Sequence, residues 1–339
     1  MTSPSPEPTA ELPRRQLGPL LTVAIWACVV PFVVWAVVRV AGWERGFVGV
    51  ALMAFTPYVA MASLGVLALP LVSRRWWAAG VAAIACVALS SCVLPRWFAD
   101  SGAARPATPG PDAVFMSSNL RVGGADPARV VAIVRDHHVD VLAVQELTVE
   151  AERALDAAGL ADLLPHRVTG PLAGVGGTGL YARYPITEAG VRENPGGFRQ
   201  AYGTVTVPGA RPVAVESMHP VPPTNALGAA LLVEDLAAAP KATLDGPVRV
   251  LIGDFNSTLD HVALRRLIGT GYRDAAAAVG AGLSPTWPYY GPRALVTAKV
   301  TIDHVLADTR VGVREVVVIG VPRTDHRAVV ATLVLPGAA

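Results

Sequence analysis

The first hundred residues lack charged side chains over three long stretches. Residues 16–38, 46–73 and 76–95 contain no Asp, Glu, Lys, Arg or His. A helix needs about 20 residues to cross the hydrocarbon core of a membrane, so each stretch is long enough to span. A cleaved signal peptide followed by buried helices would also be apolar, but three runs separated by arginines favour spans. We therefore predict a three-helix transmembrane anchor at residues 16–96.

The missing ionisable groups also bear on what this segment does. A transporter or a proton relay needs charged or titratable side chains at membrane depth, because those groups carry the substrate or the proton. The three stretches have none. They therefore favour an anchor over a transport pathway.

Cysteine is missing from the rest of the chain. The three cysteines, Cys28, Cys86 and Cys92, all fall in the apolar stretches. A cysteine-free C-terminal part fits an oxidising exterior but also occurs in the cytosol. Cysteine usage therefore does not decide the compartment.

The C-terminal part also lacks an excess of basic over acidic residues. Residues 113–339 contain 20 Lys and Arg against 21 Asp and Glu, for a formal charge of −1. Proteins that bind nucleic acid usually carry a basic surface that neutralises several phosphates. The balance argues against a tight nuclease, although arginines gathered on one face could still bind nucleic acid.

The arginines around the apolar stretches give a weak signal for orientation. With a cytoplasmic N-terminus, four arginines lie inside and four outside, so the positive-inside rule does not decide. The inside set is Arg14, Arg15, Arg74 and Arg75, and the outside set is Arg39, Arg45, Arg96 and Arg105. The paired arginines favour a cytoplasmic N-terminus. Three spans then place the C-terminal domain outside the cytoplasm of a multi-pass membrane protein.

Proline marks the segments on either side of this anchor. Residues 1–15 form a Pro-rich tail that we expect to be disordered, and residues 97–112 form a Pro/Gly/Ala-rich linker. Proline also occurs inside the apolar stretches, where Pro31, Pro57 and Pro70 are expected to kink the helices. The domain that follows occupies residues 113–339.

Apolar runs of strand length alternate with helical patterns in this domain. AVFMSSNLR (113–121) and VDVLAVQE (139–146) predict buried strands, and residues 125–138 predict a helix with Asp126 as N-cap and Pro127 at its first position. Further strands are expected at 178–183, 211–219, 248–256, 300–307 and 313–320, and helices near 224–238 and 259–268. The alternation predicts an α/β fold.

Polar side chains follow three of these strands where each strand ends. Asn119 ends the first, Glu146 ends the second, and Asp254 with Asn256 ends a later one. Open α/β folds place their sites at such strand ends. A single acid after a strand is usually a turn or helix cap, so the ordered set carries the functional signal.

The ordered set resembles the endonuclease/exonuclease/phosphatase superfamily, which includes DNase I-like nucleases, sphingomyelinases and inositol polyphosphate 5-phosphatases. The motifs are SSNL (117–120), VQE (144–146), MHP (218–220), GDFN (253–256), TIDHVL (301–306) and TDH (324–326). TGLYAR (178–183) and PTWPY (285–289) match further family elements. The resemblance covers residues 113–335. It implies a four-layer α/β sandwich, with two mixed sheets face to face and helices outside, and a cleft at one edge between the sheets.

The chemistry of the donor set predicts a magnesium or manganese site. A hard cation held by few carboxylates, with water and substrate completing its shell, suits Mg²⁺ or Mn²⁺ better than zinc. Glu146 is the expected ligand, and Asn119 is an oxygen donor near it. By resemblance, Asp325 binds the metal or its water.

The resemblance also assigns the catalytic residues. It implies that Asp254 orients or deprotonates the attacking water and that Asn256 hydrogen-bonds the phosphate. His326 contacts the scissile phosphate and is held by Asp303, while His219 matches the second phosphate-contacting histidine. The sequence leaves open which histidine is the general acid, and whether Asp254 or a His-Asp pair is the base. His304 is interpreted as structural.

The layout of tail, spans and domain resembles that of membrane-anchored actinobacterial members of the superfamily, including the teicoplanin-resistance-associated, VanJ-like type. This implies a cell-envelope lipid phosphate or pyrophosphate as substrate and the lipid bilayer as a partner. The alternative is a membrane-tethered nuclease or phosphodiesterase. A third possibility, an inactive binding domain, predicts loss of a core residue, and every expected residue is present.

Overall fold

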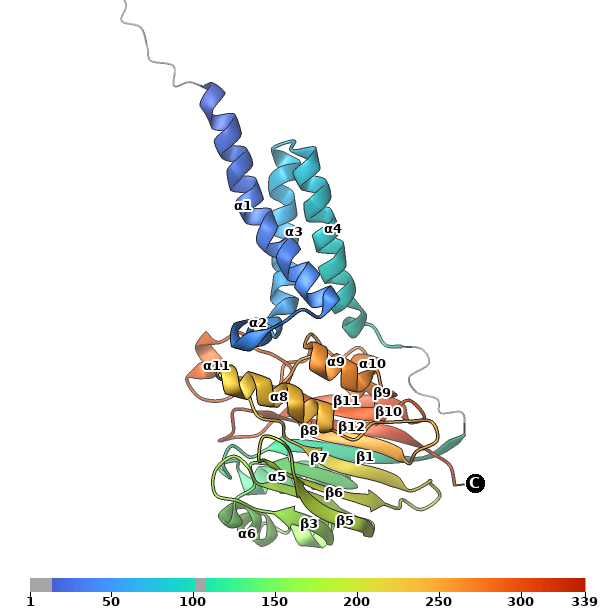
Figure 1. Ribbon diagram of the computed structural model, residues 1–339. Coiled ribbons are helices and arrows are strands. Elements are labelled where there is room, and N and C mark those ends of the chain that lie inside the picture. Colours follow the sequence, from blue (N-terminus) through green and yellow to red (C-terminus); the bar gives the residue numbers. More distant parts are fainter. Residues whose placement is uncertain (1–13, 101–107, 339) are drawn as a thin grey trace, which may run out of the picture.

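The computed structural model describes residues 14–100 and 108–338, with an elongated helical part standing on an α/β sandwich (Figure 1). The predicted disorder of residues 1–13 and the middle of the predicted linker, 101–107, lie outside the described residues. The first helix begins at Arg14, inside the predicted tail. The first strand begins at Pro109, four residues before the predicted domain boundary.

The N-terminal part contains four α-helices and a short 3₁₀ turn. Their bounds are α1 Arg14–Ala41, α2 Gly46–Met53, α3 Thr56–Val72, α4 Trp76–Val93 and η1 Leu94–Trp97. By length and composition α1 and α4 could each cross a membrane, and α2 with α3 could form a third span only if the bent pair counts as one.

The second apolar stretch is therefore not the single helix that we predicted. The axes of α2 and α3 differ by 77°. Pro57 lies in the first turn of α3, where its missing N–H has no helical partner to lose. Pro57 thus begins a helix instead of kinking one, whereas Pro31 and Pro70 lie inside α1 and α3.

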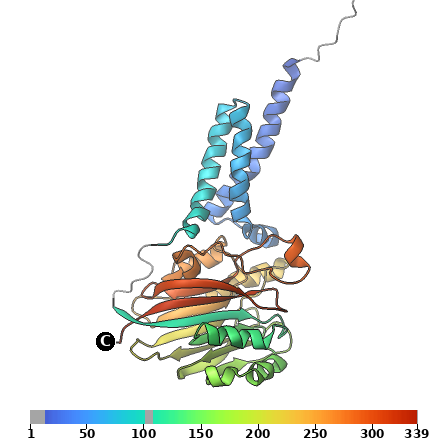
Figure 2. The ribbon, with the colours of Figure 1, turned by 180° about the vertical axis from the view of Figure 1, so that it is seen from behind.

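Helices α1, α3 and α4 run side by side, and α2 lies across their domain end (Figures 1 and 2). The outer surface of the bundle is rich in exposed Val, Leu and Ile. Exposed tryptophans lie near both of its ends, Trp76 and Trp77 at the turn into α4, and Trp43 and Trp97 next to the domain. A helical surface that is apolar all round is typical of a membrane segment.

The domain contains two six-stranded mixed sheets. Their strand orders are β11-β12-β1-β2-β4-β3 and β5-β6-β7-β8-β10-β9. The strands of the first sheet are β1 Pro109–Asn119, β2 Val141–Gln145, β3 His166–Gly170, β4 Thr178–Ala182, β11 Gly312–Gly320 and β12 Arg327–Pro336. Those of the second are β5 Ile186–Glu193, β6 Arg199–Val205, β7 Val213–Met218, β8 Val248–Asp254, β9 Tyr272–Asp274 and β10 Asp303–Asp308.

Apolar side chains from both sheets form the central core, which includes Phe115, Leu180, Val250 and Leu333. A second core lies between the first sheet and its covering helices, and a third between the other sheet and its helices. The covering helices are α5 Pro127–Asp136, α6 Val149–Ala157, α7 Leu160–Leu163, α8 Ala226–Ala238 and α9 Val262–Ile268, with short helices α10 Ala275–Ala278 and α11 Arg293–Val296 elsewhere. The predicted four-layer sandwich is confirmed.

Helix α5 shows why the local sequence folds as predicted. The side chain of Asp126 accepts hydrogen bonds from the N–H groups of Ala128 and Arg129, so it caps the helix. Pro127 follows at the start of the helix, and Val130 and Val134 are buried against the sheet.

The helical part and the domain share a buried interface. Val50 of α2 belongs to the same core as residues of α8 and α9. The carboxylate of Asp260 is fully buried. It accepts hydrogen bonds from Arg39 Nε at 2.6 Å and from Arg96 Nη2 at 2.5 Å. Burial alone would raise the pKa of Asp260, but the hydrogen bonds and charges of the two arginines outweigh it and lower that pKa. We call these three residues the junction cluster.

Candidate active site

The predicted site residues meet at one edge of the sandwich because parallel strand pairs end there. In the first sheet β1 and β2 are parallel and pair Asn119 with Gln145, the residue before Glu146. In the second sheet β7 and β8 are parallel and pair Met218 with Gly253. This pairing brings together His219 and Asp254, the residues that follow. The loop before β12 and the start of β10 add His326 and Asp303 at the same edge.

Asp254 lies at the centre of this group and is buried. Its Oδ2 atom lies 3.6 Å from His326 Nε2 and 3.8 Å from His219 Nε2. The same oxygen accepts a hydrogen bond of 3.0 Å from Asn119 Nδ2, and Oδ1 accepts one of 2.8 Å from the Asn256 N–H. The carboxylate is therefore held in place and faces two imidazoles.

The two histidines differ in charge. Burial opposes a charged imidazole, but the carboxylates of Asp303 and Asp254 outweigh it at His326 and raise its pKa to about 10. Asp303 lies 3.0 Å from His326 Nδ1. At His219 burial dominates and lowers the pKa. At neutral pH the site therefore pairs a charged His326 with a neutral His219. The His219 ring packs against Phe198, with the ring centroids 5.0 Å apart.

Glu146 has the environment of a metal ligand. Its Oε2 accepts from the Val122 N–H at 2.7 Å and its Oε1 from Asn119 Nδ2 at 3.1 Å. Burial raises the pKa of Glu146, and among the described residues no Lys or Arg forms an ion pair with it. Its φ of +57° is uncommon for a residue other than glycine. A strained, poorly compensated carboxylate fits a divalent cation.

Asn119 lies between the two carboxylates of Glu146 and Asp254. Its amide oxygen accepts a hydrogen bond from the Arg121 N–H, so the amide nitrogen is the group that faces the site. That nitrogen donates to both Glu146 and Asp254. Asn119 therefore bridges the two carboxylates through its nitrogen, and a metal role for its oxygen stays a prediction.

A second set of groups could in principle hold an ion. Ligand atoms of Asp254, Asp303 and His326 all lie within 4.8 Å of one another. His326 and Asp303, however, are already hydrogen-bonded to each other. The charged imidazole of His326 lies between the carboxylates of Asp303 and Asp254 and balances their charge, so Glu146 is the carboxylate that could hold an ion.

Asp325 and Asn256 are partly engaged by neighbours. Asp325 Oδ2 accepts from Trp287 Nε1 at 3.1 Å, and Oδ1 lies 3.6 Å from Arg121 Nε. Asn256 has a φ of +48°, and its Nδ2 donates to the Pro220 carbonyl at 2.9 Å. A metal role for Asp325 and a phosphate role for Asn256 stay predictions.

Two threonines that the sequence analysis did not single out orient this group. Thr324 Oγ1 donates to the Asn119 carbonyl at 2.9 Å and accepts from the His326 N–H at 3.2 Å. Thr286 Oγ1 accepts from the N–H groups of Ile302 and Asp303. Both lie in quoted motifs, TDH and PTWPY, so their place in those motifs was an available signal.

His304 belongs to a separate buried pair. Its Nδ1 lies 2.8 Å from Asp274 Oδ2, and its Nε2 lies 2.9 Å from the Ser257 carbonyl. Both contacts fix it inside the domain, as expected for a structural histidine.

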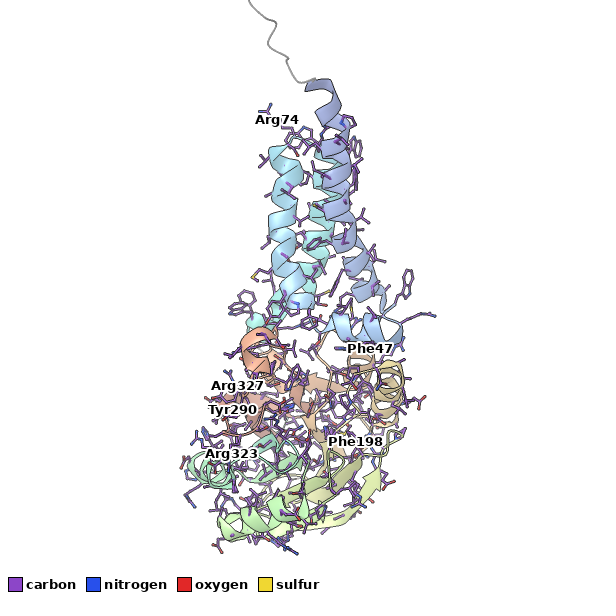
Figure 3. All side chains as sticks on the ribbon, turned by 90° about the vertical axis from the view of Figure 1, so that its left-hand side faces the viewer. Phe47, Arg74, Phe198, Tyr290, Arg323 and Arg327 are labelled. Atoms are coloured by element: carbon purple, nitrogen blue, oxygen red, sulfur yellow. The ribbon has the colours of Figure 1, made fainter. Side chains whose placement is uncertain are left out.

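Figure 3 shows the edge that carries the site. Arg323, Arg327 and Tyr290 lie on one side of this face and Phe198 on the other. Phe198 contacts His219 and Arg327 directly follows His326 in the chain, so both labelled side chains adjoin candidate site residues. Arg121 and Arg323 are exposed here, and each lies near an aspartate, Asp325 at 3.6 Å and Asp126 at 3.8 Å respectively.

Known proteins share this fold. An endonuclease/exonuclease/phosphatase protein from Beutenbergia cavernae superimposes with a TM-score of 0.52 at 22% identity, over 67% of this chain and 72% of that one. A humanized Danio rerio TDP2 gives 0.53 at 17% identity, over 66% and 98%. D. rerio TDP2 complexed with a single-stranded DNA product gives 0.51 at 16%, over 66% and 98%. At these identities the likeness shows the fold alone.

No curated protein matches the chain. The model of the Endonuclease/Exonuclease/phosphatase family, in contrast, matches residues 116–326. These bounds enclose all of the candidate site residues described above. The chain belongs to the Endonuclease/Exonuclease/phosphatase family.

Proposed function

We propose that the protein is a membrane-anchored, divalent-metal-dependent phosphohydrolase that acts outside the cytoplasm on a lipid phosphate or pyrophosphate of the cell envelope. The observation that carries phosphoester hydrolysis is the position of Asp254 Oδ2, 3.6 Å from His326 Nε2 and 3.8 Å from His219 Nε2. A proton acceptor and two donors at one strand edge suit water attack on a phosphoryl group.

Each residue has a chemical task in this proposal. Asp254 accepts the proton of the attacking water. His326, charged and oriented by Asp303, donates from Nε2 to a phosphoryl oxygen and balances its charge. A pKa of about 10 is far from neutral pH, so His326 suits charge stabilisation better than proton transfer. Neutral His219 is the better candidate for proton transfer, because it would take up the proton of the attacking water from Asp254 and pass it to the leaving oxygen.

Glu146 and Asp325 would hold the divalent cation, Mg²⁺ or Mn²⁺. The ion would neutralise charge on the phosphoryl oxygens. The second N–H of the Asn256 amide would donate to the same phosphate, since the first donates to Pro220.

Membrane anchoring is supported by the helical bundle. Helix α3 has 17 residues, which at 1.5 Å per residue extend about 25 Å, and it runs beside α1 and α4 (Figure 1). Three helices side by side favour three crossings, which place the N-terminus and the domain on opposite sides. A reporter fused to the C-terminus that works only outside the cytoplasm should therefore be active, and one that works only inside should be silent.

The lipid substrate is supported by the junction. The cluster of Asp260, Arg39 and Arg96 fixes the domain directly against the bundle. A site held at the membrane surface meets lipid head groups at high effective concentration. The near-neutral charge of residues 113–339 gives no general attraction to nucleic acid.

A membrane-tethered nuclease is the second candidate, and one observation favours it. Arg121 and Arg323 are exposed beside the site, where they could contact a nucleic-acid backbone. The two candidates differ in the substrate that the purified protein cleaves.

The test is to incubate the full chain in detergent with undecaprenyl pyrophosphate, phospholipid and plasmid DNA in parallel. We expect phosphate release from the lipid pyrophosphate, loss of activity in EDTA, and recovery when Mg²⁺ is restored. Glu146→Ala should lose activity while its circular dichroism stays unchanged, and Glu315→Ala, at an exposed position on β11, should remain active. Full turnover in excess EDTA would contradict the metal mechanism, and cleavage of DNA alone would overturn the lipid substrate.

A further inference from the structure

A cavity of about 360 Å³ lies between the helical bundle and the domain. Its volume falls within the range of small-molecule sites. Helix α3 provides one wall, the end of α4 with η1 provides another, and three loop segments of the domain provide the floor. None of the catalytic residues described above lines it. We call it the junction cavity.

The walls of the junction cavity are apolar and reach the outer surface of the bundle. Met61, Leu64, Leu94 and Trp97 line it, and they are 65%, 59%, 50% and 67% exposed. Residues that both line a cavity and face outward mark its opening. The surrounding helix surface is apolar, so in a membrane this opening faces lipid. The bilayer interior supplies hydrocarbon chains and excludes polar ligands, which identifies the occupant as a hydrocarbon chain.

The floor of the cavity belongs to the same segments that carry the catalytic residues. Thr258 and Thr301 line it, each two residues from Asn256 and Asp303 respectively. Pro285 also lines it, directly before Thr286, which binds the Asp303 N–H. The cavity and the catalytic group are therefore built on shared loops.

The rim of the cavity adds a positive charge. Lys299 lines the cavity and its side chain is exposed, while its carbonyl accepts a hydrogen bond of 2.7 Å from Tyr58 OH of α3. An ammonium group at the edge of an apolar cavity suits a ligand with a hydrocarbon chain and an anionic head group.

From these observations we infer that the junction cavity holds the hydrocarbon chain of the substrate lipid while its phosphate reaches the catalytic edge. This inference rests on the proposed function and deepens it, since it names a chain-binding subsite. The subsite makes hydrolysis depend on chain length, because each buried methylene contributes to binding.

The first test compares a long-chain and a short-chain alkyl pyrophosphate as substrates of the full chain in detergent. We expect kcat/KM to be at least about tenfold higher for the long chain, a difference carried by KM. Leu64→Trp, which fills the cavity, should remove most of this preference and leave the short substrate unaffected. Val72→Trp lies on the same helix at an exposed position that does not line the cavity, and it should behave as the wild type.

Two outcomes of this test would overturn the inference without touching the proposed hydrolysis. One is a wild-type protein that cleaves both substrates equally well. The other is a Leu64→Trp protein that keeps the long-chain preference.

The second test measures binding to the cavity independently of hydrolysis. A non-hydrolysable long-chain bisphosphonate with a photoreactive group in its chain should crosslink to Met61, Leu94 or Trp97, and an unlabelled long-chain bisphosphonate should compete. Equal competition by phosphatidylcholine would mean that the cavity holds bulk lipid only, which overturns the inference. If none of the phosphate substrates is cleaved, the proposed function fails, and this crosslinking still decides whether the cavity binds the chain.

Discussion

Two buried aspartates six residues apart in the chain, Asp254 and Asp260, have opposite kinds of partner. Asp254 faces the imidazoles of His326 and His219. Asp260 faces the guanidinium groups of Arg39 and Arg96. Of the two imidazoles, the neutral one of His219 can take up a proton, whereas a guanidinium stays charged. The first carboxylate is therefore placed to exchange protons and the second to fix two parts of the molecule together.

This difference distinguishes the buried carboxylate of the candidate active site, Asp254, from the buried carboxylate of the junction cluster, Asp260. Both carboxylate oxygens of Asp260 accept hydrogen bonds from the two arginines of the junction cluster. Asp254 Oδ2 lies beyond hydrogen-bond distance from both imidazoles, so neither imidazole is paired with this carboxylate. An unpaired histidine is expected beside a carboxylate that exchanges protons, and paired arginines are expected beside one that holds a structure together.

Replacing Asp254 by Asn should give the largest effect. We expect kcat to fall by about 10² to 10⁴, the usual contribution of a general base, with little change in the thermal unfolding midpoint. Asp274→Asn is the matched control, because Asp274 also pairs with a buried imidazole, that of His304, but away from the site. It should lower stability and preserve kcat per folded molecule. The comparison breaks if both variants lose turnover equally.

Replacing Asp260 by Ala should act on stability instead. It leaves two buried arginines without their carboxylate, which typically costs about 3–5 kcal/mol. Asp112→Ala removes the exposed pair with Arg314 and should leave the stability almost unchanged, because solvent screens such a pair. Chemical denaturation of the full chain in detergent measures both. If the two variants unfold at the same denaturant concentration, Asp260 does not hold the junction.

The pH dependence of the two sites should run in opposite directions and give the smallest effect. The folded pKa of Asp260 is lowered, so its contribution is fully present above the unfolded value of about 3.9 and is lost as pH falls through the folded pKa. The folded pKa of His326 is raised to about 10, so its contribution is fully present below the unfolded value of about 6.5 and is lost as pH rises towards 10.

This prediction is checked on metal-free protein, by the stability difference between the wild type and Asp260→Asn, and between the wild type and His326→Gln, across pH. The first difference should shrink only in acid and the second only in alkali. Parallel pH curves for the two differences would show that the partners do not set the response.

The strands and most of the site could be predicted because each functional residue adjoins an apolar run. Glu146 and Asp254 directly follow residues buried in β2 and β8, so the strand pattern predicts that both lie at strand ends. The roles of Thr286 and Thr324 needed coordinates, because they act through backbone groups that are distant in sequence. The orientation of the Asn119 amide likewise depends on a local turn that composition does not reveal.

The break between α2 and α3 and the junction cluster could not be predicted, for a different reason. Hydropathy is the same for a straight and a bent helix, so the 77° bend leaves no trace in it. In the sequence Arg39 and Arg96 directly follow apolar stretches, where an arginine indicates the orientation of a membrane span. Their bonds to Asp260 join residues more than 160 positions apart, and no local pattern records such a pairing.

Helix α2 has a practical consequence for handling this protein. Val50 completes the outer core formed by α8, α9 and β8, although it precedes the domain by nearly sixty residues. A chain shortened to begin at Pro109 would open that core to water and would be prone to aggregate. The α/β domain is thus expected to need α2 for a complete core, and its purification calls for the full chain.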